Sequence, residues 1–340
     1  MNICIFDHHI IDHPVAMGGV SKLVEILFEG LASKGYKPTL IAHGSAEGSY
    51  HVKGGSFIAL SATQIDDLRY GKTPIKKYFS GDIFHSQTSG KHANFDFTGF
   101  EGKWVATCQG SDMEDAAAQY LVFVSKSQLL NHCNIFSSHL RCENMFLAYN
   151  CFEDGMKYQN GEHDKLIWIG EIRPDKGVHL LPEIAKKIGR AIYIYGPISH
   201  PEYFQNHLEP YIGYSIHYKG FLATAQEKND ALSSAELFIH PATFNEPFGM
   251  TLVESMICGV PFTGFATGSL PELSPTPQLL AKNLDEICNV IKSGGFKNYS
   301  KLCIEHAMQF SAENFINNYA NIYNSIISSP YKRAKCEENN

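Results

Sequence analysis

The chain has 340 residues, of which 44% are hydrophobic, enough to fill the cores of two ordinary domains. Its 28 Lys and Arg against 35 Asp and Glu give a net charge of -7. This balance disfavours a nucleic-acid binder, because phosphate neutralisation needs a clustered excess of cations. Nine scattered cysteines without a C-x-x-C pair indicate reduced thiols in a cytoplasmic protein rather than a zinc site. No signal-peptide pattern and no apolar run near the ~20 residues that cross a bilayer are present, so any membrane contact is expected to be peripheral.

Short apolar runs alternate with longer amphipathic segments along the first half of the chain, which predicts parallel strands connected by helices. The clearest helix is expected over 20–33, with Val24 and Leu27 on its apolar stripe and Gly35 as its stop. Strands are expected at 2–6, 39–43, 57–60, 82–85, 104–107, 121–124 and 145–148.

The second half repeats this alternation after a polar, glycine-containing stretch, 151–164, which we expect to link a first domain, 1–150, to a second, 165–311. A last helix, 312–330, is expected to cross back toward the first domain. The fold class is therefore α/β, with two Rossmann-like domains whose parallel sheets face each other across a cleft. Strands are expected at 166–169, 192–195, 215–218, 237–240 and 262–265, and helices at 178–187, 225–232, 249–258, 284–291 and 299–308.

The most informative stretch is 237–272, LFIHPATFNEPFGMTLVESMICGVPFTGFATGSLPE. Glu246 is expected at the mouth of a strand, and Glu254 follows after a Pro-Phe-Gly turn that opens a helix. Gly249 lets the backbone come close to a ligand, and the free N–H groups at the helix start suit an anionic or hydroxyl-rich ligand. A carboxylate can also accept two hydrogen bonds from a vicinal diol. The alternative is an ordinary buried helix flanked by two surface glutamates.

These residues resemble glycosyltransferase family 4, retaining enzymes of the GT-B fold, whose hallmark is a Glu-x7-Glu pair within P-S-x-x-E-P-F-G-x-x-x-x-E-A-M-x-x-G-x-P-V. By that resemblance, Glu246 binds hydroxyls of the donor hexose and Glu254 holds the ribose hydroxyls. The backbone contacting sugar and phosphate would be that of Phe248, Gly249, Met250 and Thr251. The positions in register are His240, Pro241, Glu246, Pro247, Phe248, Gly249, Glu254, Met256, Gly259 and Pro261.

A second family phrase, G-R-x-x-x-E-K-G, has its counterpart in GEIRPDKG at 170–177. In the family, the Arg and Lys neutralise the leaving diphosphate, so the resemblance implies that no metal and no other cofactor is needed. Lys176 is in register, whereas Glu171 occupies the arginine position. Because strand alternation returns the same face every two residues, Arg173 would reach the same pocket if the strand continues that far. The alternative is that Arg173 caps the surface and Lys176 alone carries the charge.

The match is thinner in the first domain. Gly19, in Met17-Gly18-Gly19-Val20, resembles the family's Gly-Gly turn that approaches the diphosphate, and the absence of G-x-G-x-x-G argues against a nicotinamide enzyme. Gln109 stands nearest to the position of a family histidine, and it can bond a sugar hydroxyl but cannot act as an imidazole. Residues expected to face the acceptor, with a solvated loop as the alternative, are Asp12, His13 and Asp112.

The resemblance implies a retaining transfer of a hexose or N-acetylhexosamine from a nucleoside diphosphate sugar, with UDP favoured over GDP, to a glycan, lipid-linked or small-molecule acceptor. The setting expected is cell-surface polysaccharide or glycoconjugate biosynthesis. Three alternatives stay open: a nucleotide-sugar epimerase of the same fold, a non-catalytic or weakly active nucleotide-sugar binding protein, and a metal phosphoesterase using the DHH letters of 7–9. A basic, aromatic run at 69–79 is the candidate for peripheral contact with the membrane's inner face.

Overall fold

The computed structural model describes residues 1–8, 19–44, 48–52, 54–87, 93–110, 118–135, 144–160 and 162–328. The chain forms two compact units: unit 1 comprises Met1–Asn150 and Ala312–Asn340, and unit 2 comprises Cys151–Ser311. The stretch 151–164, expected as a linker, therefore belongs to unit 2. Within it, the backbone N–H of Phe152 donates to the carbonyl of Phe310 at 3.1 Å.

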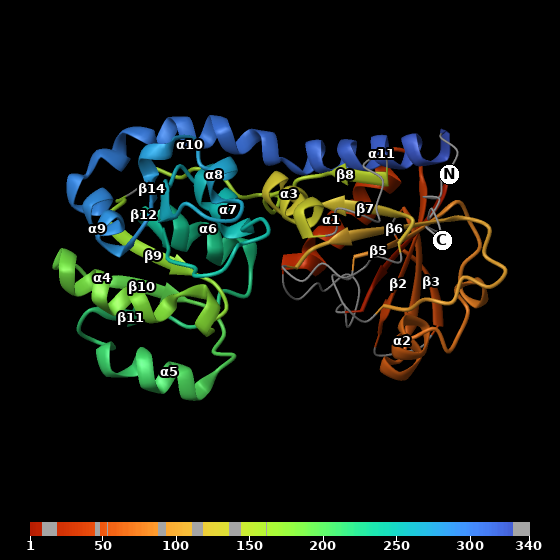
Figure 1. Ribbon diagram of the computed structural model, residues 1–340, viewed down its shortest axis with the longest axis horizontal. Coiled ribbons are helices and arrows are strands. Elements are labelled where there is room, and N and C mark those ends of the chain that lie inside the picture. The colour runs from red at the N-terminus through yellow and green to blue at the C-terminus, as the bar shows by residue number, and fades with distance from the viewer. Residues whose placement is uncertain are drawn as a thin grey trace, which may run out of the picture. The chain divides into compact units, whose positions relative to one another are not determined.

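Unit 1 is built on an eight-stranded sheet of order β3-β4-β2-β1-β5-β6-β7-β8, in which β3 runs antiparallel to β4 and the other neighbours are parallel (Figure 1). The central strands are apolar on both faces: Ile3, Ile5 and Phe6 of β1 have no exposed surface. Such continuous burial is typical of parallel strands covered on both sides by helices. The strands are β1 (Asn2–Asp7), β2 (Lys37–His43), β3 (Gly48–Val52), β4 (Gly55–Leu60), β5 (Ile83–Ser86), β6 (Lys103–Cys108), β7 (Tyr120–Phe123) and β8 (Met145–Leu147).

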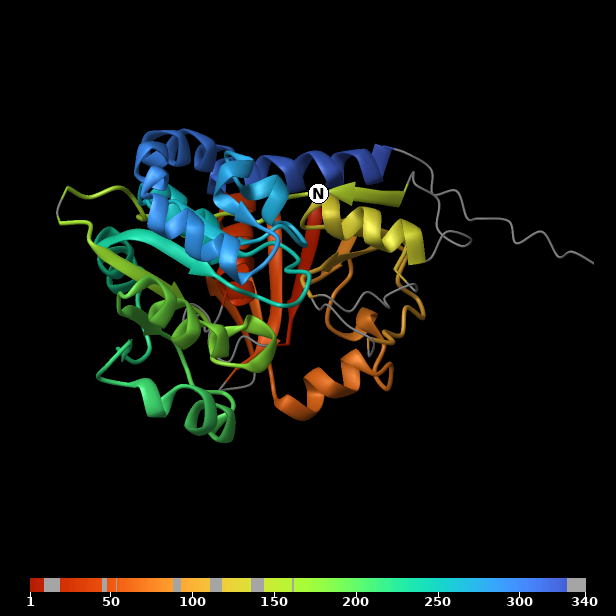
Figure 2. The same ribbon diagram turned by 60° about the vertical axis from the view of Figure 1, so that its left-hand side comes forward.

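The helices of unit 1 include the last helix of the chain. α11 (Ala312–Ser328) lies against α1 (Gly19–Ser33), as both views of the ribbon show (Figure 1, Figure 2). α11 buries Tyr319 and Tyr323 completely, so its apolar face forms part of the unit 1 core. The remaining helices are α2 (Ala62–Arg69) and α3 (Lys126–Ile135).

Unit 2 is built on a six-stranded parallel sheet of order β11-β10-β9-β12-β13-β14. Every residue of β12 is buried, again as expected for a strand covered on both faces. The strands are β9 (Lys165–Ile169), β10 (Ile192–Tyr195), β11 (Ile216–Tyr218), β12 (Ala235–His240), β13 (Phe262–Phe265) and β14 (Leu280–Ala281). The helices are α4 (Leu181–Ile188), α5 (Pro201–His207), α6 (Ala225–Ser233), α7 (Met250–Ile257), α8 (Leu270–Leu273), α9 (Leu284–Ser293) and α10 (Ser300–Ala307).

The prediction of two α/β units with parallel sheets is confirmed, and most expected elements are found within a few residues of their predicted bounds. The structure adds elements that the sequence analysis did not predict, namely β3, α2, α3, α5, α8 and β14. The helix expected over 178–187 begins as a 3₁₀ turn, Val178–Leu180, and becomes α-helical only from Leu181, where Pro182 follows within the first turn.

Membrane-spanning helices were not expected. The longest described helix, α11, has 17 residues. None of the helices in the described part of the chain is long and apolar enough to cross a bilayer.

Candidate functional site

Glu246 and Glu254 lie on either side of one tight turn beyond the carboxyl end of β12. Gly249 forms the cap of α7 with φ 86° in the left-handed region, which a residue with a side chain rarely adopts. A Cβ at this position would lie 2.8 Å from Leu252 Cδ1. The glycine therefore allows the chain to turn sharply from Glu246 into α7, which carries Glu254.

Glu246 lies in a cluster of two nitrogen-bearing side chains. Lys176 Nζ donates to Glu246 Oε2 at 2.7 Å, and His240 Nε2 lies 3.4 Å from the same oxygen. Burial opposes ionisation of this carboxyl, but His240 and Lys176 outweigh it and hold the pKa of Glu246 at about 2. Glu246 is therefore an anion at neutral pH. Both neighbours act on Oε2.

Lys176 reaches Glu246 because Gly177 allows two loops to approach closely. Gly177 has φ 67°, and a Cβ there would lie only 1.8 Å from the carbonyl oxygen of Pro241. The backbone N–H of Thr243 also donates to the carbonyl of Asp175 at 3.0 Å. The glycine of the second family phrase thus brings the loop after β9 against the loop after β12, and the lysine beside it into contact with Glu246.

Arg173 lies in a different environment from Lys176. The strand was expected at 166–169, and β9 does end at Ile169, while Pro174 opens a 3₁₀ turn directly after Arg173. The condition under which strand alternation would bring Arg173 to this pocket is therefore not met. Arg173 instead pairs with Glu171, the carboxylate at the family's arginine position, and with Asp175: Nη1 lies 3.2 Å from Glu171 Oε2, and Nε lies 2.8 Å from Asp175 Oδ1. Arg173 is therefore shared between two partly exposed carboxylates rather than placed by strand alternation.

Glu254 is almost completely buried, with 1% of its side chain exposed, and accepts a hydrogen bond from Lys228 Nζ at 2.9 Å. Burial raises the pKa of the Glu254 carboxyl, and the nearby ammonium of Lys228 opposes that rise. Lys228 was not identified from the sequence. A signal was present only in part: α6 precedes β12, so a cation on its inner face can meet the helix that follows β12.

Of the residues expected in unit 1, Gln109 follows β6 and is held in an amide cluster. Its Nε2 donates to Gln87 Oε1 at 3.0 Å and to Asn150 Oδ1 at 3.3 Å, while Asn150 Nδ2 donates to Gln109 Oε1 at 2.9 Å. Gly19 is the first residue of α1. The residues expected to face an acceptor, Asp12, His13 and Asp112, lie outside the described part of the chain.

The buried His85 of β5 lies next to this amide cluster, with its Nε2 3.5 Å from Gln87 Nε2. His85 Nδ1 is 2.6 Å from the Tyr323 hydroxyl of α11, and Nε2 is 2.7 Å from Thr107 Oγ1. Burial lowers the pKa of His85 to about 3, so the imidazole is neutral at physiological pH. This network connects α11 to the ends of β5 and β6. It reaches Gln109 through Gln87.

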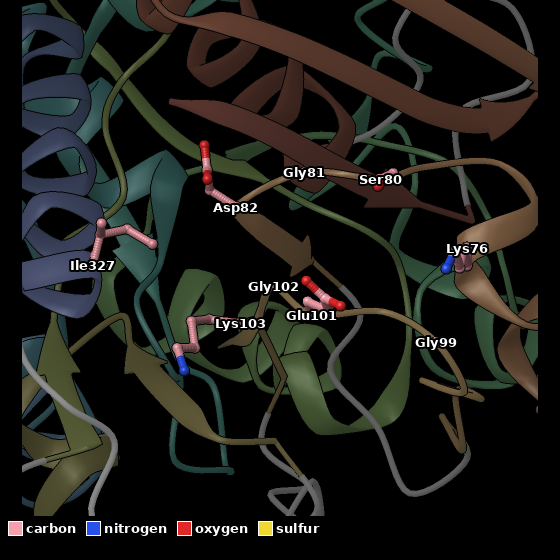
Figure 3. Close-up of a pocket in the computed structure, with 9 residues that line it drawn as sticks. All are labelled: Lys76, Ser80, Gly81, Asp82, Gly99, Glu101, Gly102, Lys103 and Ile327. Atoms are coloured by element: carbon pink, nitrogen blue, oxygen red, sulfur yellow. The ribbon is translucent and has the colours of Figure 1, made fainter.

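A hollow of about 500 Å³ in unit 1 is a less suitable site for a nucleotide. It lies at the amino ends of β5 and β6, whereas Gln109 follows the carboxyl end of β6. Figure 3 shows its charged side chains, Lys76, Asp82, Glu101 and Lys103, pointing in different directions rather than toward one point. In open α/β sheets, ligands bind beyond the carboxyl ends of the strands, where Glu246 is located.

Known proteins resemble the chain at the level of both domain and fold. Residues 163–292 match the family model for glycosyl transferases group 1. The sulfoquinovosyl transferase SQD2 of Arabidopsis thaliana is 23% identical over 150 residues, which are 44% of this chain and 29% of that protein. The chain thus matches less than a third of that relative's length.

Two solved structures cover nearly the whole chain. Sucrose-phosphate synthase from Thermosynechococcus elongatus has a TM-score of 0.77 at 15% identity, covering 97% of this chain and 100% of that one. The Anabaena protein HepE, in complex with UDP-glucose, has a TM-score of 0.69 at 14% identity, covering 96% and 100%. The chain therefore has the GT-B fold, and its match to the model for glycosyl transferases group 1 lies within unit 2.

Proposed function

We propose that the protein is a retaining glycosyltransferase that transfers a hexose or N-acetylhexosamine from UDP-sugar to a glycan, lipid-linked or small-molecule acceptor. The observation that carries this proposal is the pair of buried glutamates around α7, each with one oxygen held by a lysine: Glu246 by Lys176 and Glu254 by Lys228. Two anchored carboxylates on one turn suit a ligand with two sets of hydroxyls, and a nucleoside diphosphate sugar has them on its ribose and its hexose. We favour UDP as the nucleotide of the donor, because HepE was solved in complex with UDP-glucose.

In this proposal Glu246 accepts hydroxyls of the hexose through Oε1, and Glu254 accepts hydroxyls of the ribose. The backbone from Phe248 to Thr251, at the start of α7, contacts the sugar and the diphosphate between them. Backbone N–H groups at a helix start carry partial positive charge, which favours an anionic ligand there. In unit 1, Gly19 and Gln109 are further proposed donor contacts.

The chemical step proposed is a front-face displacement. The acceptor oxygen forms a bond to the anomeric carbon, the bond from that carbon to the β-phosphate oxygen breaks, and the acceptor proton passes to the departing phosphate. Lys176 and Arg173 are the cations proposed to stabilise the charge that develops on the diphosphate, so no metal is required. Positioning of the two substrates supplies most of the remaining rate enhancement.

The acceptor is proposed to be an intermediate of cell-surface polysaccharide or glycoconjugate synthesis on the cytoplasmic side, with Asp12, His13 and Asp112 near it.

A second candidate function is that of a non-catalytic nucleotide-sugar binding protein. Two observations favour it: Arg173 is shared between Glu171 and Asp175, and a glutamine stands where the family has a histidine.

Donor hydrolysis and transfer distinguish the two candidates. The purified protein is incubated with UDP-glucose or UDP-N-acetylglucosamine in excess EDTA, and release of UDP is followed with and without a mixture of alkyl glycoside acceptors. The proposal predicts acceptor-dependent release of UDP and an α-linked product from an α-linked donor, read from the anomeric proton by NMR. Tight binding without UDP release would favour the binding protein, and a β-linked product would exclude retention.

A further inference from the structure

Three charged side chains from three separate segments meet inside unit 2. Lys228 of α6 lies 2.9 Å from Glu254 Oε1 of α7 and 3.6 Å from Glu153 Oε2, in the segment that opens the unit. Their side chains are largely buried, with 22%, 1% and 16% exposed for Lys228, Glu254 and Glu153. The ammonium of Lys228 therefore forms ion pairs with two carboxylates in a weakly solvated environment, where charge interactions are strong.

The two oxygens of Glu254 are treated differently. Oε1 accepts the hydrogen bond from Lys228, whereas Oε2 is buried and has no hydrogen-bond partner among the residues the structure describes. A buried acceptor without a donor is costly, and such atoms are rare in folded proteins. Oε2 is therefore the atom of this cluster that a ligand hydroxyl would satisfy.

The ionisation of Glu254 depends on its neighbours from every side. Burial is the largest influence and raises the pKa of its carboxyl, Lys228 opposes that rise, and Glu153 adds to it. Two thiols nearby stay neutral: burial raises the pKa of Cys258 to about 12 and that of Cys151 further still. Lys228 is thus the cation that favours the anionic form of Glu254.

We propose that Lys228 is a positioning residue for nucleotide binding, which holds Glu254 as an anion with Oε2 directed to the ribose 2′-hydroxyl. The inference rests on the proposed function, because it deepens the role of the nucleotide end of that site. It assigns Lys228 no contact with the ligand. Lys228 increases the preference for ribose over deoxyribose, because it sets the charge and orientation of the Glu254 carboxylate.

The test compares UDP with 2′-deoxy-UDP by calorimetry on the full chain, from pH 6 to pH 8.5. The wild type is expected to prefer UDP by about tenfold, the scale of one charge-assisted hydrogen bond. Lys228→Met is expected to lose most of this preference, because loss of the ammonium raises the pKa of the Glu254 carboxyl further and frees its orientation, and to regain part of it as the pH rises. Lys228→Arg restores the cation and the preference, and Lys301→Met, at a lysine with 90% of its side chain exposed, leaves both affinities unchanged.

Glu153→Gln provides an independent readout in the opposite direction. Removing the second carboxylate lowers the pKa of Glu254, so the pH at which the preference for UDP is half lost moves down, whereas Lys228→Met moves it up. This variant and Lys228→Arg decide the question if Lys228→Met does not fold, as judged by its thermal unfolding.

The inference is overturned if Lys228→Met weakens both nucleotides equally, which is the result of a purely structural role, or if it changes neither affinity. A wild type that binds both nucleotides equally overturns the ribose assignment and leaves sugar transfer intact. A wild type that binds neither nucleotide contradicts the proposed donor class, and the inference fails with it.

Discussion

Glu246→Gln tests the electrostatics of the site through the stability of unit 2. The pKa of Glu246 falls from 4.5 to about 2 in the folded protein, a shift worth about 3 kcal/mol at 1.36 kcal/mol per pH unit. Because the folded pKa is depressed, this contribution is fully present above about pH 4.5 and is lost as the pH falls toward 2. Linkage predicts that about 2 kcal/mol of it is lost between pH 7 and pH 3. Glutamine does not titrate, so the stability difference between wild type and variant should shrink by that amount.

The assay is urea unfolding followed by tryptophan fluorescence. The chain has two tryptophans, Trp104 in β6 and the buried Trp168 in β9, so a Trp104→Phe background leaves a reporter in unit 2 alone. Following one unit matters because two-domain proteins need not unfold in a single step. Glu305→Gln, at a largely exposed carboxylate, is the matched control. If the difference between wild type and Glu246→Gln is the same at pH 7 and pH 3, Glu246 is not held as an anion by Lys176 and His240.

Three further predictions concern binding and turnover. Sugar transfer should persist in excess EDTA, and complete loss that magnesium or manganese restores would contradict metal independence. Glu254→Gln should weaken the binding of free UDP by about 1.5 to 3 kcal/mol in calorimetry, whereas Glu246→Gln should weaken only the binding of the intact UDP-sugar. Equal effects of the two variants on the binding of free UDP would remove this assignment. Lys176→Ala should lower turnover by about a hundredfold and by more than Arg173→Ala, because Lys176 contacts Glu246 whereas Arg173 is shared between two carboxylates. Higher activity of Glu171→Arg with unchanged activity of Arg173→Ala would show that this arginine has no role in transfer.

The strands of both sheets were predictable because parallel strands are buried on both faces, which gives the continuous apolar runs of β1 and β12. Edge and surface elements lack that signal. The residues of β3, GSYHV, contain no apolar run, and α3 is polar along much of its length. α2 was missed although Ser61 and Gln64 form a capping box, which a closer examination of the sequence can find.

At the site, the sequence indicated a tight turn but did not indicate which side chains pair across the fold. Gly249 indicated close approach of the backbone, and it has a positive φ angle there. Gly177, which was not singled out for such an approach, also has a positive φ angle where two loops meet. Strand alternation could not place Arg173, because β9 ends at Ile169, before Pro174. The pairing of Lys228 with Glu254 joins two helices through the fold, and no spacing in one sequence specifies which lysine meets which glutamate.

The central claim is that unit 2 binds a nucleoside diphosphate sugar, and thermal unfolding of the wild type with UDP, GDP, ADP and their common sugars tests it most directly. A ligand at 100 times its dissociation constant stabilises the folded state by about 2.7 kcal/mol, which raises the melting temperature by several degrees. The largest rise is expected with a UDP-sugar, and a smaller one for the same ligand with Glu246→Gln. No rise with any of these nucleotides at millimolar concentration would contradict the central claim.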